Sequence, residues 1–415
     1  MHVALFTHRY PPARGGAEYY AAKLATHLQQ HGNDVTVWTT SAIKLEEFWH
    51  GCLQPSSVQD SIRRYRPIAF PLRRYVLKTL SLLTPPRLRS WVLPCNPVCP
   101  GMLRDVLHSS GPLDCVHATA FPYAWPILCG LRLARRHGVP FHLTPFLHLG
   151  DERTRKQYTQ PALRWLLNEA DRVFVQTKLE YDALLELGVK RDRVTLQGLG
   201  VDVAECTGGD RERFRSSHAP VIGHLANLSC EKGTVDLLRA CEQLWQRGRM
   251  FRVVLAGADM ANFRDYWNGF AFKDRVTLMG PLSDDTKRDF YACIDIFALP
   301  SRTDSFGLVL LEAWANGKPN VAYACGGPSE IIRHNIDGLL AETGNIVDLA
   351  NQFERLIADD SLRVQLGEAG SDRIADEFDW ESKLEVVTNH MMIDASQFRS
   401  DHPRNAWESL TPRLS

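Results

Sequence analysis

Short apolar segments alternate with amphipathic helical segments along most of this 415-residue chain. The segment HVALFT is followed by a helical stretch that ends at Gly32, and the apolar segment DVTVWTT comes next. The alternation continues through LDCVHAT, PFHLTPFLH, RVFVQT and RVTLQG. Strands that alternate with helices are typical of a parallel sheet covered by helices on both faces. We therefore predict an α/β fold made of doubly wound parallel sheets.

The same alternation restarts after Asp202, which indicates a second domain of the same kind. A chain of this length also exceeds what one hydrophobic core normally organises. We predict Rossmann-like domains over residues 1–200 and 201–385, joined by a hinge over the polar segment 198–217. Residues 386–415 are expected to cross back to the first domain or to be disordered, and the polar tail 401–415 favours disorder. Ligands of such sheets bind at the carboxyl ends of the strands, so a cleft between two facing sheets is the expected site.

Composition limits the class of protein. No run of about 18 uncharged apolar residues occurs, and the N-terminal segment lacks the pattern of a secretory leader, so we expect a cytoplasmic protein. The ten cysteines are scattered without a C-x-x-C pair, which predicts reduced thiols rather than a zinc or disulfide framework. The sequence lacks a D-x-D pair on a loop, the pattern that would indicate a bound divalent ion. We therefore expect neither a metal nor a cofactor.

Charge is distributed unevenly although the formal net charge is zero. Residues 1–200 hold 25 Lys and Arg against 15 Asp and Glu, and residues 201–415 hold 23 against 33. The stretch 61–104 has nine cations and no acid, interleaved with aromatic and aliphatic residues. This pattern favours contact with an anionic membrane surface at the inner face, or with an acceptor that carries phosphate. A solvated helical face fits equally well, and no motif indicates nucleic acid.

Two carboxylates stand on either side of a Ser-Phe-Gly turn in the segment PSRTDSFGLVLLEAWANGKP. A strand enters this turn and an apolar helix leaves it, so an anionic phosphate is favoured at the helix N-terminus. The amides expected there belong to Ser305, Phe306, Gly307 and Leu308. Glu312, more than one turn into the helix, is placed to accept ribose hydroxyls, and Asp304 to accept sugar hydroxyls. The alternative is that Asp304 is only an N-cap and Glu312 lies on the polar face of a surface helix. The helix is apolar nearly all round, however, so we expect it to be buried, and a buried carboxylate needs a partner.

Three further positions fit a phosphate-binding site. Lys232 precedes Gly233 and a new helix, so an ammonium and a helix N-terminus converge there. Gly15 and Gly16 stand at another helix N-terminus, where amides can approach a pyrophosphate. That loop lacks the G-x-G-x-x-G fingerprint of a nicotinamide oxidoreductase. Gly257 and the stretch containing Met279 and Leu282 are a predicted wall for the nucleotide base.

The segments PPARGGAE, TPFLH, NLSCEKG and DSFGLVLLE occur in one order that resembles the family 4 glycosyltransferases over about residues 1–385. The resemblance implies the two-domain GT-B fold, a donor-binding second domain, an acceptor-binding first domain and a retaining mechanism. It implies catalytic roles for His148, Asp304 and Lys232. The implied acceptor contacts are Arg14, His117 and Asp151. Two residues depart from the family pattern: Asp304 replaces a Glu, and Asn227 replaces an Arg of the phosphate cage, which Arg14 could compensate.

The predicted function is the transfer of a hexose from a nucleotide-diphosphate sugar to a saccharide or lipid-linked acceptor, in polysaccharide or glycolipid assembly. Fold alone does not settle chemistry, so a nucleotide-sugar epimerase or a phosphorylase-like enzyme stays an alternative. A sugar-nucleotide-binding protein without catalysis is another. Neither the donor base, the sugar nor the acceptor follows from the sequence, and the basic stretch 61–104 favours a lipid-linked acceptor.

Overall fold

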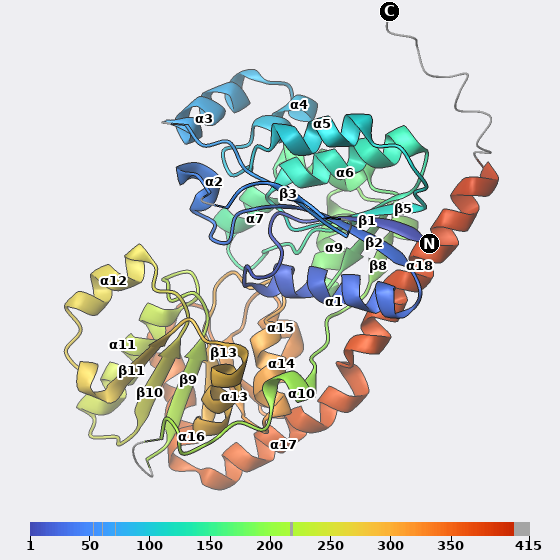
Figure 1. Cartoon of the computed structure of the whole chain (residues 1–415). Coiled ribbons are helices and arrows are strands. Elements are labelled where there is room, and N and C mark those ends of the chain that lie inside the picture. Colours follow the sequence, from blue (N-terminus) through green and yellow to red (C-terminus); the bar gives the residue numbers. More distant parts are fainter. Residues whose placement is uncertain (53, 60, 71, 216–218, 402–415) are drawn as a thin grey trace, which may run out of the picture. The chain divides into compact units, whose positions relative to one another are not determined.

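The computed structural model describes residues 1–52, 54–59, 61–70, 72–215 and 219–401 (Figure 1). The chain divides into two compact units. The first comprises Met1–Leu147, Lys156–Gln197 and Leu384–Ser415, and the second comprises His148–Arg155 and Gly198–Lys383. The predicted hinge segment belongs to the second unit over its described part and contains the short helix α10 (Val203–Cys206). The predicted tail lies outside the described residues from position 402 onward.

An eight-stranded sheet organises the first unit, in the order β3-β4-β2-β1-β5-β6-β7-β8. Its strands are β1 (His2–Phe6), β2 (Asp34–Thr40), β3 (Ser57–Val58), β4 (Ile62–Tyr65), β5 (Cys115–Thr119), β6 (Phe141–Thr144), β7 (Arg172–Val175) and β8 (Val194–Leu196). All neighbours pair in parallel except β3 and β4. The central strands are buried on both faces, as expected for a sheet covered by helices on either side.

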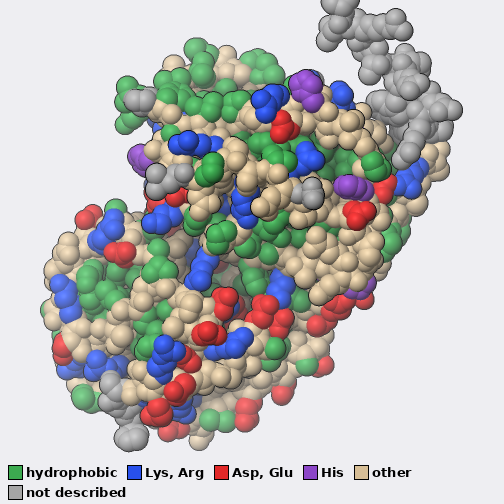
Figure 2. Space-filling view, in the orientation of Figure 1, with side chains coloured by type: hydrophobic (Ala, Val, Ile, Leu, Met, Phe, Trp, Pro, Cys, Tyr) green, Lys and Arg blue, Asp and Glu red, His purple; other side chains and the backbone are tan. Residues whose placement is uncertain are grey.

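Helices follow most strands of the first unit. They are α1 (Gly16–Gln30), α2 (Glu47–His50), α3 (Arg73–Leu83), α4 (Pro86–Arg89), α5 (Pro100–His108), α6 (Ala124–His137), α8 (Pro161–Glu169) and α9 (Lys178–Glu186). Helix α7 (Glu152–Tyr158) begins in the segment of the second unit and ends in that of the first. The basic stretch 61–104 forms β4, α3, α4 and the start of α5. Figure 2 shows many hydrophobic side chains at the surface over this part of the first unit.

The second unit contains a six-stranded, fully parallel sheet in the order β11-β10-β9-β12-β13-β14. Its strands are β9 (Val221–Leu225), β10 (Arg252–Ala256), β11 (Val276–Gly280), β12 (Ile296–Leu299), β13 (Asn320–Tyr323) and β14 (Gly338–Ala341). Its helices are α11 (Thr234–Gln246), α12 (Ala261–Asn268), α13 (Asp284–Cys293), α14 (Leu308–Ala315), α15 (Pro328–Ile331), α16 (Ile346–Ala358) and α17 (Asp360–Glu377). The core residues of α11 and α16 belong to one cluster with the strands.

Helix α18 (Trp380–Asp401) belongs to the first unit from Leu384 onward. Its Asp394 accepts two hydrogen bonds from the Arg172 guanidinium, at 2.6 and 2.8 Å, and lies 3.0 Å from Nε2 of His142. These contacts attach the helix to β6 and β7. None of the described helices combines the length and the apolarity that a membrane-spanning segment needs.

Each sheet reverses its winding between two central strands. In the second unit the chain runs from β9 to β10 on one side and from β12 to β13 on the other. In the first unit the same divergence separates β1 from β5. The loops that leave such a strand pair at its carboxyl ends move apart and open a crevice, which is where doubly wound sheets bind ligands.

Candidate active site

Lys232 and Asp304 meet at the crevice of the second unit. Lys232 lies in the loop from β9 to α11, and Asp304 in the loop from β12 to α14. Because β9 and β12 are neighbours in the sheet, their loops leave the same edge side by side. The Lys232 ammonium lies 2.9 Å from Oδ2 of Asp304. Burial would raise the pKa of Asp304, but the Lys232 charge, His148 and the hydrogen bonds from Lys232 and Ser301 together hold this pKa below its ordinary value.

His148 lies in the same unit and interacts electrostatically with this pair. Burial lowers the pKa of His148 to about 4, and the positive charge of Lys232 acts in the same direction. Asp304 and a hydrogen bond with the backbone of Thr303 oppose the shift only in part. The imidazole is therefore neutral at physiological pH, so it can donate or accept a hydrogen bond but holds no proton for general acid catalysis.

Glycines bring the surrounding segments into close contact. A Cβ atom at Gly233 would lie 1.8 Å from the carbonyl oxygen of Pro300, and this residue has a φ of 72°. A Cβ atom at Gly327 would lie 2.3 Å from the carbonyl oxygen of Ser305, and the Gly327 amide donates to the Asp304 carbonyl at 2.9 Å. The segment 326–330 (GGPSE) thus packs directly on the loop that carries Asp304, and a side chain at Gly327 would displace that loop.

Glu312 is held by two residues that the sequence did not single out. Lys287 donates to Oε1 at 2.8 Å, and the Tyr291 hydroxyl donates to Oε2 at 2.7 Å. Both donors come from one face of α13, four residues apart, so one helix orients the carboxylate. Burial and the Glu312 charge raise the pKa of Tyr291 well above its ordinary value, which keeps its hydroxyl protonated. Each carboxylate oxygen retains lone-pair capacity for a further hydroxyl donor.

Apart from Gly15 and Gly16, the other predicted donor residues also lie in the second unit. Gly307 is the N-cap of α14 with a φ of 94°, and the side chain of Phe306 is buried beneath the turn. Gly257 follows β10, where a Cβ atom would meet the carbonyl oxygen of Ala226 at 1.7 Å. Met279 is partly exposed at the end of β11 and Asn227 is exposed after β9. The roles predicted for these residues, and for Ser305, Leu308 and Leu282, stay predictions.

A second cluster surrounds the crevice of the first unit, and the sequence analysis missed its members. Glu18, in the first turn of α1, is 2.6 Å from the Arg9 guanidinium and 3.2 Å from Nε2 of His8. Burial would raise the pKa of Glu18, but His8 and Arg9 lower it to about 2. His8 stacks on Tyr123, with ring centroids 4.4 Å apart. Strand order explains the meeting, since His8 follows β1 and Tyr123 follows β5.

The predicted glycine pair borders this cluster. Gly15 precedes α1, and a Cβ atom there would lie 2.2 Å from Oε2 of Glu18. Gly16 is the first residue of α1, and Arg14 is exposed on the same loop. The spacing G-G-x-E could have identified Glu18, because an acid in the first turn is favoured by the helix dipole.

Two predicted acceptor residues occupy different environments. His117 has no exposed surface in β5, where its Nε2 lies 3.0 Å from the Thr144 hydroxyl. Burial lowers its pKa well below the ordinary value. A side chain enclosed in this way reaches an acceptor only after a rearrangement of its surroundings. Asp151 accepts a hydrogen bond from the Thr154 amide at 3.0 Å and so caps the first turn of α7.

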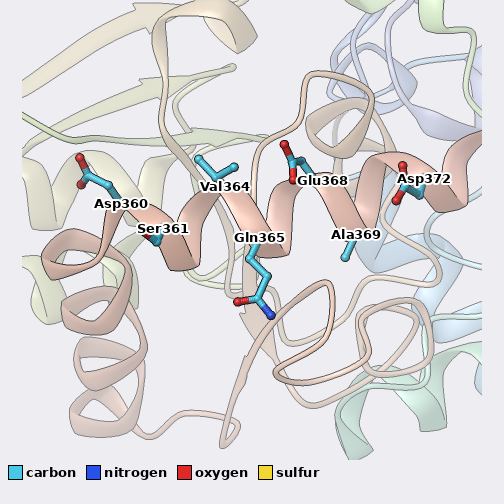
Figure 3. Close-up of a pocket in the computed structure, with 7 residues that line it drawn as sticks. All are labelled: Asp360, Ser361, Val364, Gln365, Glu368, Ala369 and Asp372. Carbon is cyan, nitrogen blue, oxygen red and sulfur yellow. The ribbon is translucent and has the colours of Figure 1, made fainter.

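A shallow hollow of about 570 Å³ runs along α17, away from these residues in the sequence (Figure 3). It is lined by Asp360, Ser361, Val364, Gln365, Glu368, Ala369 and Asp372. All seven come from one helix, so the hollow lacks converging groups from several elements that would surround a ligand.

Sequence comparisons indicate the class of protein. The model "Glycosyl transferase 4-like domain" matches residues 15–200, and the model "Glycosyl transferases group 1" matches residues 210–373. D-inositol 3-phosphate glycosyltransferase of Mycolicibacterium smegmatis is 28% identical, over 60% of this chain and 59% of the relative. The Corynebacterium aurimucosum protein of the same name is 32% identical, over 54% and 57%. The chain thus spans less than two thirds of the length of these relatives.

A longer match and two solved structures extend the comparison. D-inositol 3-phosphate glycosyltransferase of Mycobacteroides abscessus is 28% identical over 95% of this chain and 88% of the relative. Sucrose-phosphate synthase from Thermosynechococcus elongatus has a TM-score of 0.75 at 21% identity, covering 95% of this chain and 99% of the other. Anabaena HepE in complex with UDP and glucose has a TM-score of 0.71 at 19% identity, covering 94% and 99%. The chain belongs to the family 4 glycosyltransferases, which are enzymes with the GT-B fold of two Rossmann-like domains.

Proposed function

We propose that this enzyme transfers a hexose from a nucleoside diphosphate sugar to a hydroxyl of a saccharide or lipid-linked acceptor, with retention at the anomeric carbon. The observation that carries the proposal is the convergence of Lys232, Asp304 and neutral His148 at the crevice between β9 and β12. The family membership supports group transfer. The UDP-containing structures of HepE, one with glucose and one with UDP-glucose, support a nucleotide-sugar donor.

The diphosphate would bind at the N-termini of α11 and α14. The first amides of a helix have no acceptor within the helix and carry a partial positive charge. Lys232 adds a full positive charge at the same place. Together these groups stabilise the negative charge that develops on the diphosphate as its bond to the sugar breaks. Such electrostatic stabilisation is usually the largest single contribution to catalysis. We expect no metal in this role. Because Asn227 stands where the family pattern has an Arg, Lys232 is the cation on the loop from β9 to α11.

Glu312 would accept the hydroxyls of the ribose. Lys287 and Tyr291 fix its orientation before the nucleotide arrives, so little side-chain freedom is lost on binding. Glu312 lies four residues after Leu308, the first residue of α14, and this spacing separates the ribose from the phosphates by about one helical turn.

Transfer with retention would proceed on one face of the sugar. The bond from the anomeric carbon to the phosphate oxygen breaks while the acceptor oxygen bonds to that carbon from the same side. The released phosphate oxygen takes the acceptor proton, so no protein base is required. Asp304 would accept sugar hydroxyls, and neutral His148 would donate or accept a hydrogen bond at the sugar C6 or the acceptor. The predicted contacts of Arg14 and Asp151 with the acceptor, and of Gly15 with a phosphate, stay predictions.

Turnover of radiolabelled nucleotide sugars tests the proposal directly. Glu312→Ala and Lys232→Ala should each reduce turnover by about a hundredfold or more, because each removes a charged contact with the donor. Glu368→Ala and Lys273→Ala change the same residue types on exposed surfaces of the second unit and should leave turnover unchanged. Wild-type turnover retained in both site variants would refute the assignment.

Product analysis separates the alternatives. Proton NMR of the glycoside should show the anomeric configuration of the donor, and the opposite configuration would exclude retention. An epimerase would instead release an altered nucleotide sugar without an acceptor. The donor can be found by thermal-shift measurements with UDP-, GDP-, ADP- and TDP-hexoses, because a ligand that binds the folded state raises the melting temperature.

A further inference from the structure

Helix α3 is attached to the first unit along one face only. Arg73 is 2% exposed, and its guanidinium donates to the backbone carbonyls of Phe48 and Asn96. Leu77, one turn later, is 7% exposed. These two residues at i and i+4 define the inner face of the helix. Because the guanidinium is held by two carbonyls rather than by a carboxylate, this anchor adds positive charge without neutralising it.

The rest of α3 and its flanks present large apolar side chains to solvent. Leu72, Val76, Leu80 and Leu83 follow one another at helical spacing, and they are 71, 42, 44 and 79% exposed. On the remaining face Tyr75 and Leu82 are 71 and 73% exposed, and Ile68, Phe70 and Leu88 next to the helix are 43, 41 and 58% exposed. We call these nine residues the α3 surface. Figure 2 shows the gathering of hydrophobic side chains over this part of the unit.

So many exposed side chains of this size in one place are unusual for a protein surface in water. Isolated exposed leucines are common, but contiguous apolar patches mark contact sites. Five residues of the α3 surface lie on an 11-residue helix whose inner face is already occupied. The outer face therefore does not contribute to the core of the described first unit, and its hydrophobic character requires another explanation.

Cations without acidic neighbours in the sequence accompany the α3 surface. Arg66, Arg74 and Lys78 are exposed, and none of them forms an ion pair with an acid in the described part of the chain. Arg74 and Lys78 lie on α3 itself, four residues apart, beside the apolar stripe. Arg74 also stacks over the ring of Trp49, at 4.7 Å from the ring centroid. The sequence 61–104 contains no acid that would repel an anionic partner.

We propose that the α3 surface inserts into the interfacial region of a bilayer that contains anionic lipids. Apolar side chains that face outward beside unpaired cations fit this partner: the leucines enter the acyl boundary, and Arg66, Arg74 and Lys78 contact the lipid phosphates. This contact goes beyond the sugar transfer proposed above and does not require it. It would place the enzyme where a lipid-linked acceptor lies.

Vesicle sedimentation with the full chain tests the proposal. At low salt the wild type should bind phosphatidylcholine vesicles in which about a third of the lipid is phosphatidylglycerol. It should bind pure phosphatidylcholine vesicles far more weakly. Leu80→Ser with Leu83→Ser should lower the partition coefficient by about tenfold or more, because two exposed leucines no longer enter the bilayer. Arg74→Gln with Lys78→Gln should lower it by about tenfold and reduce its dependence on salt.

Val364→Ser is a matched control, because Val364 is 56% exposed on α17 in the second unit. This variant should bind vesicles as the wild type does. Unchanged vesicle binding in both α3 double variants, or equal binding to neutral and anionic vesicles, would overturn the proposal. Light scattering tests the main rival: a wild-type dimer that becomes a monomer in Leu80→Ser with Leu83→Ser would assign the surface to a second copy of the chain. Turnover on a water-soluble acceptor should persist in all variants, so failure of the membrane contact is distinguishable from failure of the transfer.

Discussion

At the scale of single residues, the site is defined by which groups hold the two carboxylates. Asp304 is paired with Lys232, and Glu312 is held by Lys287 and Tyr291. The sequence identified both acids because they flank a helix start, and it identified Lys232 because it precedes another. It could not identify the α13 residues, since nothing in a sequence aligns one face of a helix with a carboxylate on a different helix.

Tyr291→Phe isolates the orienting role of α13. The substitution removes one hydrogen bond to Glu312 and keeps the buried ring, so the free energy of unfolding should change by about 1 kcal/mol. Glu312 then loses part of its fixed orientation, and KM for the donor should rise about tenfold with a smaller change in kcat. Steady-state kinetics measure the split. A tyrosine that serves packing alone would leave both constants unchanged.

His148 should affect stability in acid. Its pKa is about 4 in the folded chain and near 6.5 when unfolded, so the unfolded state binds a proton first as the pH falls. The neutral ring therefore costs no stability above about pH 6.5 and costs progressively more between pH 6.5 and 4. Between pH 7.5 and 5, the free energy of unfolding should fall by about 1 to 2 kcal/mol more in the wild type than in His148→Gln. Urea unfolding at the two pH values measures this, with His108→Gln as an exposed control; equal losses would show that His148 titrates normally.

At the scale of elements, strand order explains why distant segments meet. The alternation of strands and helices predicted nearly all central strands of both sheets, because buried parallel strands are short and apolar. The strands β3, β4 and β14 were not predicted. Crossing of the C-terminal segment back to the first domain was one of two expectations, and α18 belongs to the first unit from Leu384 onward. Pairing between β9 and β12 is a long-range property, and it brings Lys232 to Asp304. His148 follows β6 in a loop, and its predicted role stays a prediction. The meeting of His8 and Tyr123 also depends on strand order, and the sequence analysis overlooked it.

Asp394 tests the attachment of α18 to the first unit. Asp394→Asn removes the charge that Arg172 and His142 share, and the free energy of unfolding should fall by about 1 to 3 kcal/mol. Burial would raise the pKa of Asp394, but the hydrogen bonds from Arg172 and His142 hold it far below its ordinary value. Its contribution is therefore complete above the ordinary pKa of aspartate, about 3.9, and is lost in stronger acid. Equal stability of the variant at pH 7, measured by urea unfolding, would show that this contact does not stabilise the helix.

At the scale of the whole molecule, charge is divided unevenly along the chain. The first half of the chain is basic and the second acidic, with 25 cations against 15 acids and 23 against 33. The crevice of the second unit nevertheless holds the Lys232 ammonium beside the N-termini of α11 and α14. We therefore expect local placement of charge, rather than the net charge of a half of the chain, to decide where an anionic donor binds.

The most direct test of the account is the affinity of the donor nucleotide sugar, measured by isothermal titration calorimetry on folded protein. The wild type should bind one donor per chain, and Glu312→Ala and Lys232→Ala should each weaken binding by about tenfold or more, whereas Glu368→Ala should not. Equal affinities in all four proteins, with the fold verified by circular dichroism, would contradict the assignment of the donor to the crevice between β9 and β12.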